Sequence, residues 1–296
     1  MRNETEIKNL ITGFATKDSR IRTVLLNGSR ANPNIPYDKL QDFDIVFIVS
    51  DYEGFISDHN WTNLFGEKLI HQLPDEMTFG KESNKNETIG FHYLMLFKDG
   101  NRIDLTLFPI EFLRTHFAFD SLTIVWLDKD NLFSNAPPPT DTDYHIRRPT
   151  EKEFLDTCNE FWWVSTYVAK GLIRKEITYV KEMLETVVRP MFMQIIKWKI
   201  GVENHFAVSF GKGGKFIFKY LNEDYSTRVL QTYADSDIEN NWKSLFVMTD
   251  LFEQASCEIA LRLKFQQDKD EMQNTIDYLK QLYNEPLTCA LAAVLT

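Results

Sequence analysis

The chain has 296 residues, 43% of them hydrophobic and 14% aromatic, which allows two folded domains and excludes a disordered protein. Its formal net charge of −10 argues against broad binding of nucleic acid, which requires a cationic surface, and suits a cationic small substrate. The three distant cysteines, Cys158, Cys257 and Cys289, form no CxxC pair or metal-binding spacing, and no apolar run is long enough to span a membrane, so we expect a cytoplasmic protein.

The first half of the chain combines helix and strand patterns. Residues 4–16 carry apolar side chains at intervals of three and four, which predicts an amphipathic helix, and the polar start of the chain does not predict a signal peptide. Residues 42–49 are apolar on both faces, which is typical of a central strand. Further strands are predicted at 21–26, 91–97 and 102–108, with a helix at 61–73 and a hairpin at Asp99-Gly100.

The second half has a different pattern. Residues 135–149 are rich in proline and polar side chains, which is typical of a linker. Residues 150–200 predict long helices broken near Gly171 and Pro190, and helices are also expected at 238–265 and 268–283. We therefore expect an α+β protein, with its parts at residues 1–136 (a mixed β-sheet flanked by helices), 137–149 (a linker) and 150–296 (a helical-bundle domain).

Three aspartates are candidates for a metal site. Side chains alternate along a strand, so Asp42 and Asp44 project from one face, and Asp104 shares a face with Arg102 and Thr106. If the two strands are neighbours, the three carboxylates converge and repel one another unless a cation lies among them. Oxygen ligands suit Mg²⁺, and two such ions can bind both the attacking and the leaving oxygen of a nucleotidyl transfer. All three acids are therefore candidate catalytic residues and metal ligands.

The turn before the second strand is a candidate phosphate site. Gly28 allows the backbone to approach a phosphate, and Ser29 offers a hydroxyl group and an amide. Arg30 is expected to add a charge-assisted contact. Pro33 and Pro36 limit any helix that starts here to about one turn.

These motifs resemble a known family. A Gly-Ser turn after a strand, an Asp-x-Asp pair on the next strand and a distal acid are similar to the polymerase-β-type nucleotidyltransferases. The strings "LNGSRANPN", "QDFDIVF", "DGNRIDLTL", "FWWVSTYVAKGLIRKE" and "GKGGKFIFKYL" resemble the aminoglycoside 6-adenylyltransferases more closely, over nearly the whole chain. The resemblance implies a Mg²⁺-dependent transfer of AMP from ATP to the 6-position of streptomycin, with release of pyrophosphate and loss of the antibiotic's action.

The resemblance assigns the acceptor to the helical domain. The acids Glu182 and Glu185 lie three residues apart on a predicted helix and are candidate contacts for a cationic aminoglycoside, although a solvated helix face explains them equally well. Trp163 is a candidate stacking residue, with core packing as the alternative. Lys212 and Lys215 in "GKGGK" are candidate ATP contacts, with a helix-capping loop as the alternative, because the string fails the P-loop pattern.

Other functions stay open at this point. The acceptor could be another aminoglycoside, a lincosamide or a protein side chain, and a non-catalytic nucleotide-binding module such as an antitoxin is a further alternative that the three acids disfavour. An RNA-tailing transferase is disfavoured by the negative charge and the absence of a basic tract. We expect a monomer that binds neither nucleic acid nor membranes.

Overall fold

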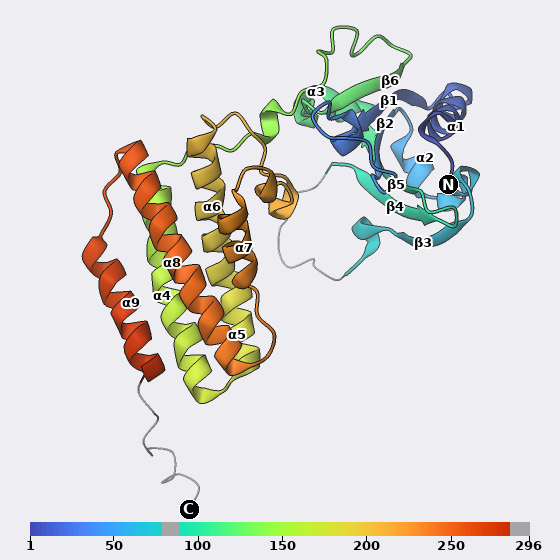
Figure 1. Cartoon of the computed structure of the whole chain (residues 1–296). Coiled ribbons are helices and arrows are strands. Elements are labelled where there is room, and N and C mark those ends of the chain that lie inside the picture. The colour runs from blue at the N-terminus through green and yellow to red at the C-terminus, as the bar shows by residue number, and fades with distance from the viewer. Residues whose placement is uncertain (79–88, 285–296) are drawn as a thin grey trace, which may run out of the picture. The chain divides into compact units, whose positions relative to one another are not determined.

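The chain divides into two compact units, Met1–Asp143 and Tyr144–Thr296 (Figure 1). The computed structural model describes residues 1–78 and 89–284, so Cys289 lies outside the described residues. The division between the units falls inside the expected linker, 137–149. The first unit contains a mixed sheet and the second consists mainly of helices, which confirms the expected α+β class.

The first unit is built on a six-stranded sheet with the order β3-β4-β5-β2-β1-β6. Strands β2 and β5 are parallel, and every other neighbouring pair is antiparallel. The central position expected for the second strand is confirmed, because β2 lies between β5 and β1. The strands are β1 (Ile21–Asn27), β2 (Phe43–Val49), β3 (Lys68–Gln72), β4 (Phe91–Phe97), β5 (Arg102–Pro109) and β6 (Thr123–Asp128).

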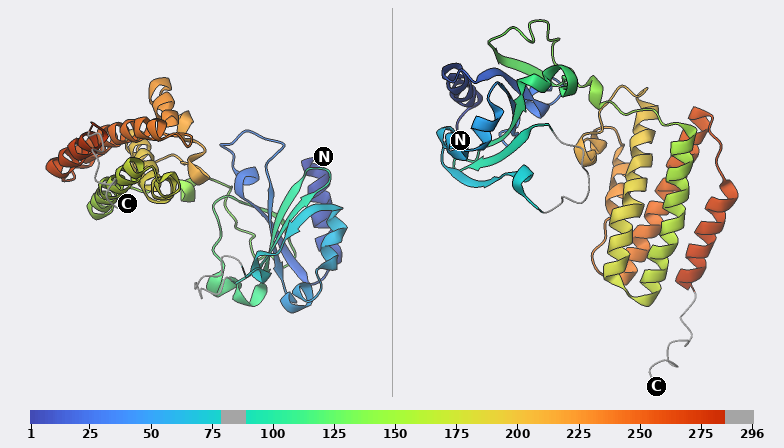
Figure 2. Two further views of the ribbon diagram at one scale, coloured as in Figure 1. Left: turned by 90° about the horizontal axis from the view of Figure 1, so that it is seen from below. Right: turned by 180° about the vertical axis from the view of Figure 1, so that it is seen from behind.

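Each face of the sheet has its own apolar cluster. Helix α1 (Glu4–Lys17) begins at a capping box formed by Asn3 and Glu6 and buries Ile7 and Ile11 against one face (Figure 2). On the other face, Leu25, Val46, Ile48 and Phe108 pack with the segment that contains the short helix α3 (Leu113–His116). Because side chains alternate along β2 and β5, Asp44 and Asp104 lie on this second face.

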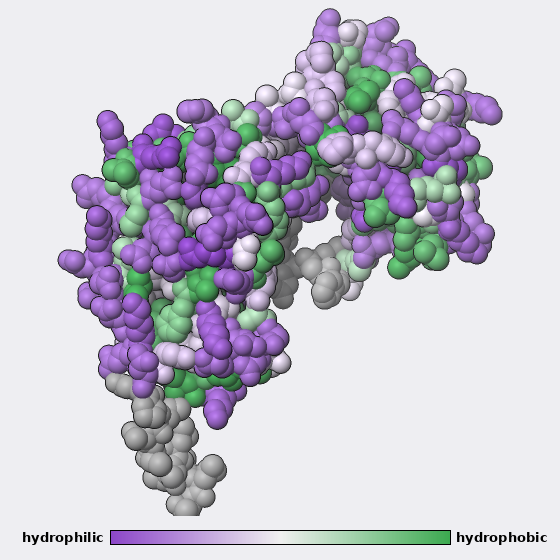
Figure 3. Space-filling model, viewed as in Figure 1, coloured by the Kyte–Doolittle hydropathy of each residue, from purple (hydrophilic) through white to green (hydrophobic). Residues whose placement is uncertain are grey.

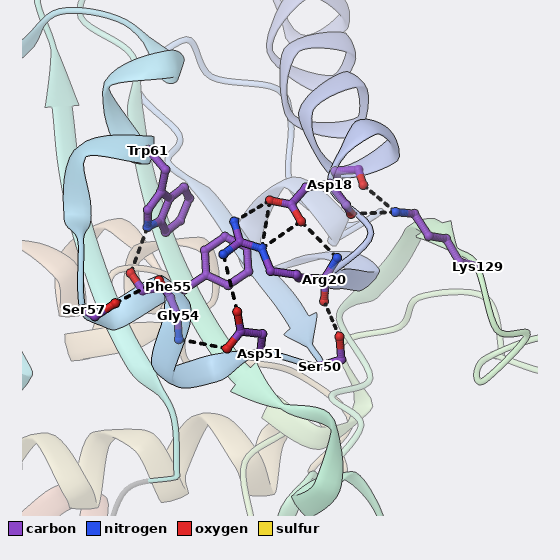
Figure 4. Close-up of polar contacts among 10 residues, drawn as sticks. Asp18, Arg20, Ser50, Asp51, Gly54, Phe55, Ser57, Trp61 and Lys129 are labelled. Atoms are coloured by element: carbon purple, nitrogen blue, oxygen red, sulfur yellow. Dashed lines mark hydrogen bonds and ion pairs between the residues drawn. The ribbon is translucent and has the colours of Figure 1, made fainter.

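Strand direction brings four chain segments to one edge of the sheet. Strand β1 ends at this edge, whereas β2, β5 and β6 begin there, as their pairing shows. At the opposite edge, where β1 begins and β2 ends, a separate polar network connects the surrounding segments (Figure 4). In that network Arg20 pairs with Asp18 and Asp51, and Lys129 donates to the carbonyl oxygens of Ala15 and Asp18. This network holds the start of β1 close to the end of β2, at the opposite edge of the sheet from Asp44 and Asp104.

The helix predicted at 61–73 is wrong. Residues His59–Phe65 form a 3-10 helix, and Gly66, at φ 127°, ends it. The chain then forms the edge strand β3, on which Leu69 and Ile70 are exposed. The apolar residues at helical spacing belong to two different elements. Trp61 and Phe65 pack inside the first unit, whereas Leu69 and Ile70 are exposed on an edge strand, so these residues do not form one buried helix face.

The second unit is a bundle whose long helices share one apolar core. Phe161 of α4 and Phe252 of α8 stack within it, with their ring centroids 3.6 Å apart. Helices α6 and α9 each run beside α4 (Figures 1 and 2). The helices are α4 (Glu151–Arg174), α5 (Ile177–Met183), α6 (Arg189–Glu203), α7 (Glu223–Gln231), α8 (Ile238–Leu263) and α9 (Lys269–Asn284).

The helix breaks predicted near Gly171 and Pro190 are displaced or absent. Gly171 lies inside α4, which ends at Arg174 and is followed by Lys175 in a left-handed conformation. Pro190 is the second residue of α6 and follows a π-helical turn, Leu184–Val188, that continues from α5. A wider turn accommodates the proline ring, which would clash with a carbonyl group in a regular helix interior. The other two predicted helices, now α8 and α9, are confirmed.

The surface of the helical unit is mostly hydrophilic, as expected when the apolar side chains are buried in an internal core. Hydrophilic side chains cover most of the visible face of the helical unit, with smaller hydrophobic areas between them (Figure 3). Within residues 1–78 and 89–284, no helix is long and apolar enough to cross a membrane.

Candidate active site

The centre of the candidate site is the parallel pairing of β2 with β5. In this register Asp44 lies directly opposite Asp104. Asp42 precedes β2 by one residue and belongs to the same alternating set as Asp44. The fold therefore brings together, at one edge of the sheet, three acids that are up to 62 positions apart in sequence.

Gly28 lies against Asp44 from the neighbouring strand. Asn27, the last residue of β1, pairs with Asp44, and Gly28 follows at φ 75°. A Cβ atom at Gly28 would lie 2.2 Å from Asp44 Oδ2, so only glycine leaves room for this carboxylate. The amide of Gly28 donates to the carbonyl oxygen of Leu122, at 3.1 Å, which fixes the turn next to the acid.

The Gly-Ser turn forms a single 3-10 turn, η1 (Gly28–Ala31), in agreement with the limit expected from Pro33 and Pro36. Ser29 is half-buried in it, and its carbonyl oxygen accepts from the amide of Asn32. A helix this short contributes little dipole, so any anion binding here depends on local amides and hydroxyl groups.

Arg30 holds the turn to the start of β2. Its guanidinium lies 3.7 Å from the ring centroid of Phe43 and donates to the carbonyl oxygens of Gln41 and Asp42, and its side chain is only 2% exposed. It also pairs with Glu4 at 3.3 Å. The sequence suggested a phosphate contact for Arg30, but in this structure the guanidinium is committed to positioning the backbone at Asp42.

Arg102 lies among the three acids. Its Nε and Nη2 atoms each donate to a different oxygen of Asp104, both at 2.7 Å, and Nε is 3.6 Å from Asp42 Oδ2. The hydrogen bond to Asp104 raises the pKa of Arg102; burial opposes this, and the charges of Asp104, Asp42 and Asp44 act in the same direction as the hydrogen bond. The sequence placed Arg102 on the same face as Asp104 but assigned it no function.

The donor set fits a hard divalent cation. It consists of carboxylate oxygens on adjacent strands, and Mg²⁺ prefers such ligands. The cradle at Gly28 also leaves space around Asp44. Across the described parts of the chain, however, no three His, Cys, Asp or Glu side chains are close enough together to hold a metal ion as they stand. The bidentate contact of Arg102 turns Asp104 toward the guanidinium instead.

The two candidate acceptor-binding acids lie in the second unit and differ in their surroundings. Glu182 is exposed on α5. Glu185 belongs to the π-helical turn and pairs with Arg189, whose guanidinium is buried and also donates to the hydroxyl and carbonyl oxygens of Thr232. Glu185 therefore has a structural partner that the sequence did not suggest; the spacing of four residues between Glu185 and Arg189 is the signal that could have indicated it.

The aromatic and cationic candidates are exposed. Trp163 is 60% exposed on α4 and donates from Nε1 to the hydroxyl of Tyr167, at 2.8 Å, whereas Trp162 is in the core. Lys212 and Lys215 are exposed in the loop around a short 3-10 helix, Lys212–Gly214. Lys215 Nζ lies 5.2 Å from the ring centroid of Phe216. The structure thus leaves these side chains accessible within their own unit.

Comparisons with known proteins point to one family. The family model described as streptomycin adenylyltransferase matches residues 1–282. An aminoglycoside 6-adenylyltransferase of Campylobacter jejuni is 44% identical over 266 residues, 90% of this chain and 91% of that protein. One of Bacillus subtilis is 40% identical over 92% of this chain and 95% of its own. A crystal structure of an aminoglycoside 6-adenyltransferase from Bacillus subtilis covers 96% of this chain and 100% of its own, at 34% identity and a TM-score of 0.47.

Proposed function

Because the chain belongs to the streptomycin adenylyltransferase family, we propose that it inactivates an aminoglycoside by transferring AMP from ATP to one of its hydroxyl groups. Streptomycin is the proposed acceptor, modified at its 6-position, and pyrophosphate is the second product. The relatives are named for adenylyl transfer to aminoglycosides, and they match about nine-tenths of the chain.

The observation that carries this proposal beyond the family is the pairing of Asp44 with Asp104 beside Gly28. Asp42, Asp44 and Asp104 are the residues that would hold Mg²⁺, which would supply positive charge to the triphosphate. Asp104 is also the proposed acceptor of the proton from the attacking hydroxyl group. The hydroxyl and amide of Ser29 are proposed to bind the phosphates, since the amide of Gly28 already donates to Leu122.

The second unit is proposed to hold the acceptor. A polycation favours acids whose charge is exposed, and Glu182 is the better candidate because Glu185 already pairs with Arg189. Trp163 offers an exposed ring for stacking on a sugar or guanidinium group. The exposed Lys212 and Lys215 are the proposed contacts for the phosphates of ATP.

The test compares the wild-type protein with Asp104→Asn, using ATP, Mg²⁺ and streptomycin, and follows AMP addition by mass spectrometry. We expect the wild type to add one AMP, and the variant to be about 100- to 10,000-fold slower, because it loses a proton acceptor and a ligand. Asp130→Asn is the matched control, since Asp130 pairs with Arg22 where β1 begins and β6 ends, at the opposite edge of the sheet from Asp104. Turnover of Asp104→Asn at the wild-type rate would contradict the site, and wild-type protein that modifies no aminoglycoside would contradict the function.

A further inference from the structure

We propose that Arg102 is a positioning residue that stands in for a divalent cation among Asp42, Asp44 and Asp104, and that it must release Asp104 before such a cation binds. This inference rests on the proposed function, because it deepens the account of the same site. In this proposal the ion pair between Arg102 and Asp104 is not permanent, because a divalent cation replaces Arg102 as the partner of Asp104.

The contacts of Arg102 are those of a counterion for the whole group of acids. The planar guanidinium donates from Nε and Nη2 to the two carboxylate oxygens of Asp104, at 2.7 Å each. Its Nε atom also lies 3.6 Å from Oδ2 of Asp42. A bidentate arginine–carboxylate contact is among the stronger ion pairs, and it fixes the orientation of the carboxylate. Asp104 thus has a defined partner in the protein without metal, and the like charges of the acids are offset.

Arginine and a divalent cation exclude each other here. Both require the oxygens of Asp104, and two positive charges a few ångströms apart repel strongly in a partly buried site. The described acids do not gather as a metal-binding group in the presence of this ion pair. Withdrawal of Arg102 would free both oxygens of Asp104 to turn toward Asp44, its partner in the register.

Arg102 has room to withdraw, whereas the other arginine of the site does not. The side chain of Arg102 is 44% exposed and belongs to the first residue of β5, so its long stem can move into solvent. Arg30 is 2% exposed and is held by backbone carbonyl oxygens and the ring of Phe43. The site therefore combines one fixed arginine, which positions backbone, with one exchangeable arginine, which compensates charge.

The experiment measures binding of Mn²⁺ alone, by electron paramagnetic resonance, to metal-free wild-type, Arg102→Gln and Arg22→Gln proteins. Arg22→Gln is the matched control, because it also removes a strand arginine from an ion pair with an aspartate, at a position outside the site. We expect Arg102→Gln to bind Mn²⁺ about tenfold more tightly than wild type, equivalent to about 1.4 kcal/mol, and Arg22→Gln to bind as wild type does.

Thermal melting provides a second readout. In a chelating buffer Arg102→Gln should melt below wild type, because the three acids lose their counterion, and saturating Mn²⁺ should remove most of that difference. Arg102→Lys keeps the charge but loses the fork, so its Mn²⁺ affinity should lie between those of the wild type and Arg102→Gln. The lysine variant also gives a decisive comparison if Arg102→Gln does not fold.

Several results would overturn the inference. One is Mn²⁺ binding by Arg102→Gln, or by Arg102→Lys where it replaces that variant, that is equal to or weaker than binding by wild type. Another is a loss of melting temperature that Mn²⁺ does not restore, as a purely structural arginine would give, and a third is the absence of Mn²⁺ binding by wild type and variant alike. The proposed function fails separately, if the wild type transfers no AMP to any aminoglycoside.

Discussion

At the scale of single residues, Gly28 is notable because any side chain at this position would overlap with the carboxylate of Asp44. The positive φ of 75° and the 2.2 Å distance from a hypothetical Cβ atom to Asp44 Oδ2 are separate constraints. The positive φ affects stability, because a residue with a Cβ atom is strained in this backbone conformation. The short distance affects the orientation of the Asp44 carboxylate, and so the rate of AMP transfer. Their effects can be separated by substitution.

Gly28→Ala should lose much more activity than stability. A left-handed alanine costs about 1–2 kcal/mol, and the displaced carboxylate of Asp44 should reduce AMP transfer by about 100-fold or more. Gly100→Ala is the matched control: its φ is 83°, and its added Cβ meets only the flexible end of Met1, at 3.0 Å. Chemical denaturation and steady-state kinetics on both variants check this. Comparable activity losses at the two glycines would contradict the assignment to Asp44.

At the scale of elements, the π-helical turn between α5 and α6 links a candidate substrate acid to a buried arginine. Arg189 is held by Glu185, by Thr232 and by the ring of Tyr233, whose centroid is 3.8 Å away. This arrangement connects the turn to the residues that follow α7. Single-turn π segments are frequent at functional sites, so both a structural and a binding role must be tested.

Glu185→Gln should reduce stability, and Glu182→Gln should reduce binding. Replacing Glu185 weakens the partner of a buried cation and should cost about 1 kcal/mol, because Glu185 is half-exposed and the Thr232 contacts remain. Glu182→Gln should leave the melting temperature unchanged and raise the KM for streptomycin severalfold with little change in kcat. Melting curves and Michaelis kinetics check both. An increase in KM confined to Glu185→Gln would reverse the two roles.

The elements also show what sequence patterns can and cannot predict. Residues 102–108 were predicted as a strand because their apolar and polar side chains alternate, and residues 42–49 because they form a short apolar run that is typical of a central strand. The shared face of Asp42 and Asp44, and that of Asp104 with Arg102, follow from the alternation of side chains along a strand. Their parallel register was not predictable, because it depends on long connections. Burial of Arg30 and the contacts of Arg102 also depend on tertiary packing. The alternation of side chains along a strand predicts the face on which a residue lies, but it does not predict which residues it contacts there. The edge strand β3 lacks a buried face and so gave no strand signal.

At the scale of the whole molecule, the apolar clusters respect the boundary between the two units. In the described residues, the cluster of the helical unit extends from Ile146 to Leu282, and the two clusters of the sheet unit lie between residues 7 and 133. Among the residues that the structure describes, no cluster of buried side chains includes residues from both units. Each unit therefore has the internal packing that an independently folding domain requires.

Residues 1–143 alone should fold, bind ATP in the presence of Mg²⁺ and transfer no AMP. The fragment keeps its sheet, both of its apolar clusters and the three acids, but it lacks every residue proposed to bind the aminoglycoside. It also lacks Lys212 and Lys215, so it should bind ATP more weakly than the whole chain does. It should unfold cooperatively on heating, and ATP with Mg²⁺ should raise the melting temperature, because a ligand that binds only the folded state stabilises it. The same fragment with Asp44→Asn is the control and should show a smaller increase. A fragment with native-like secondary structure but no cooperative transition would show that its clusters require the helical unit, and would contradict the independence of the two cores.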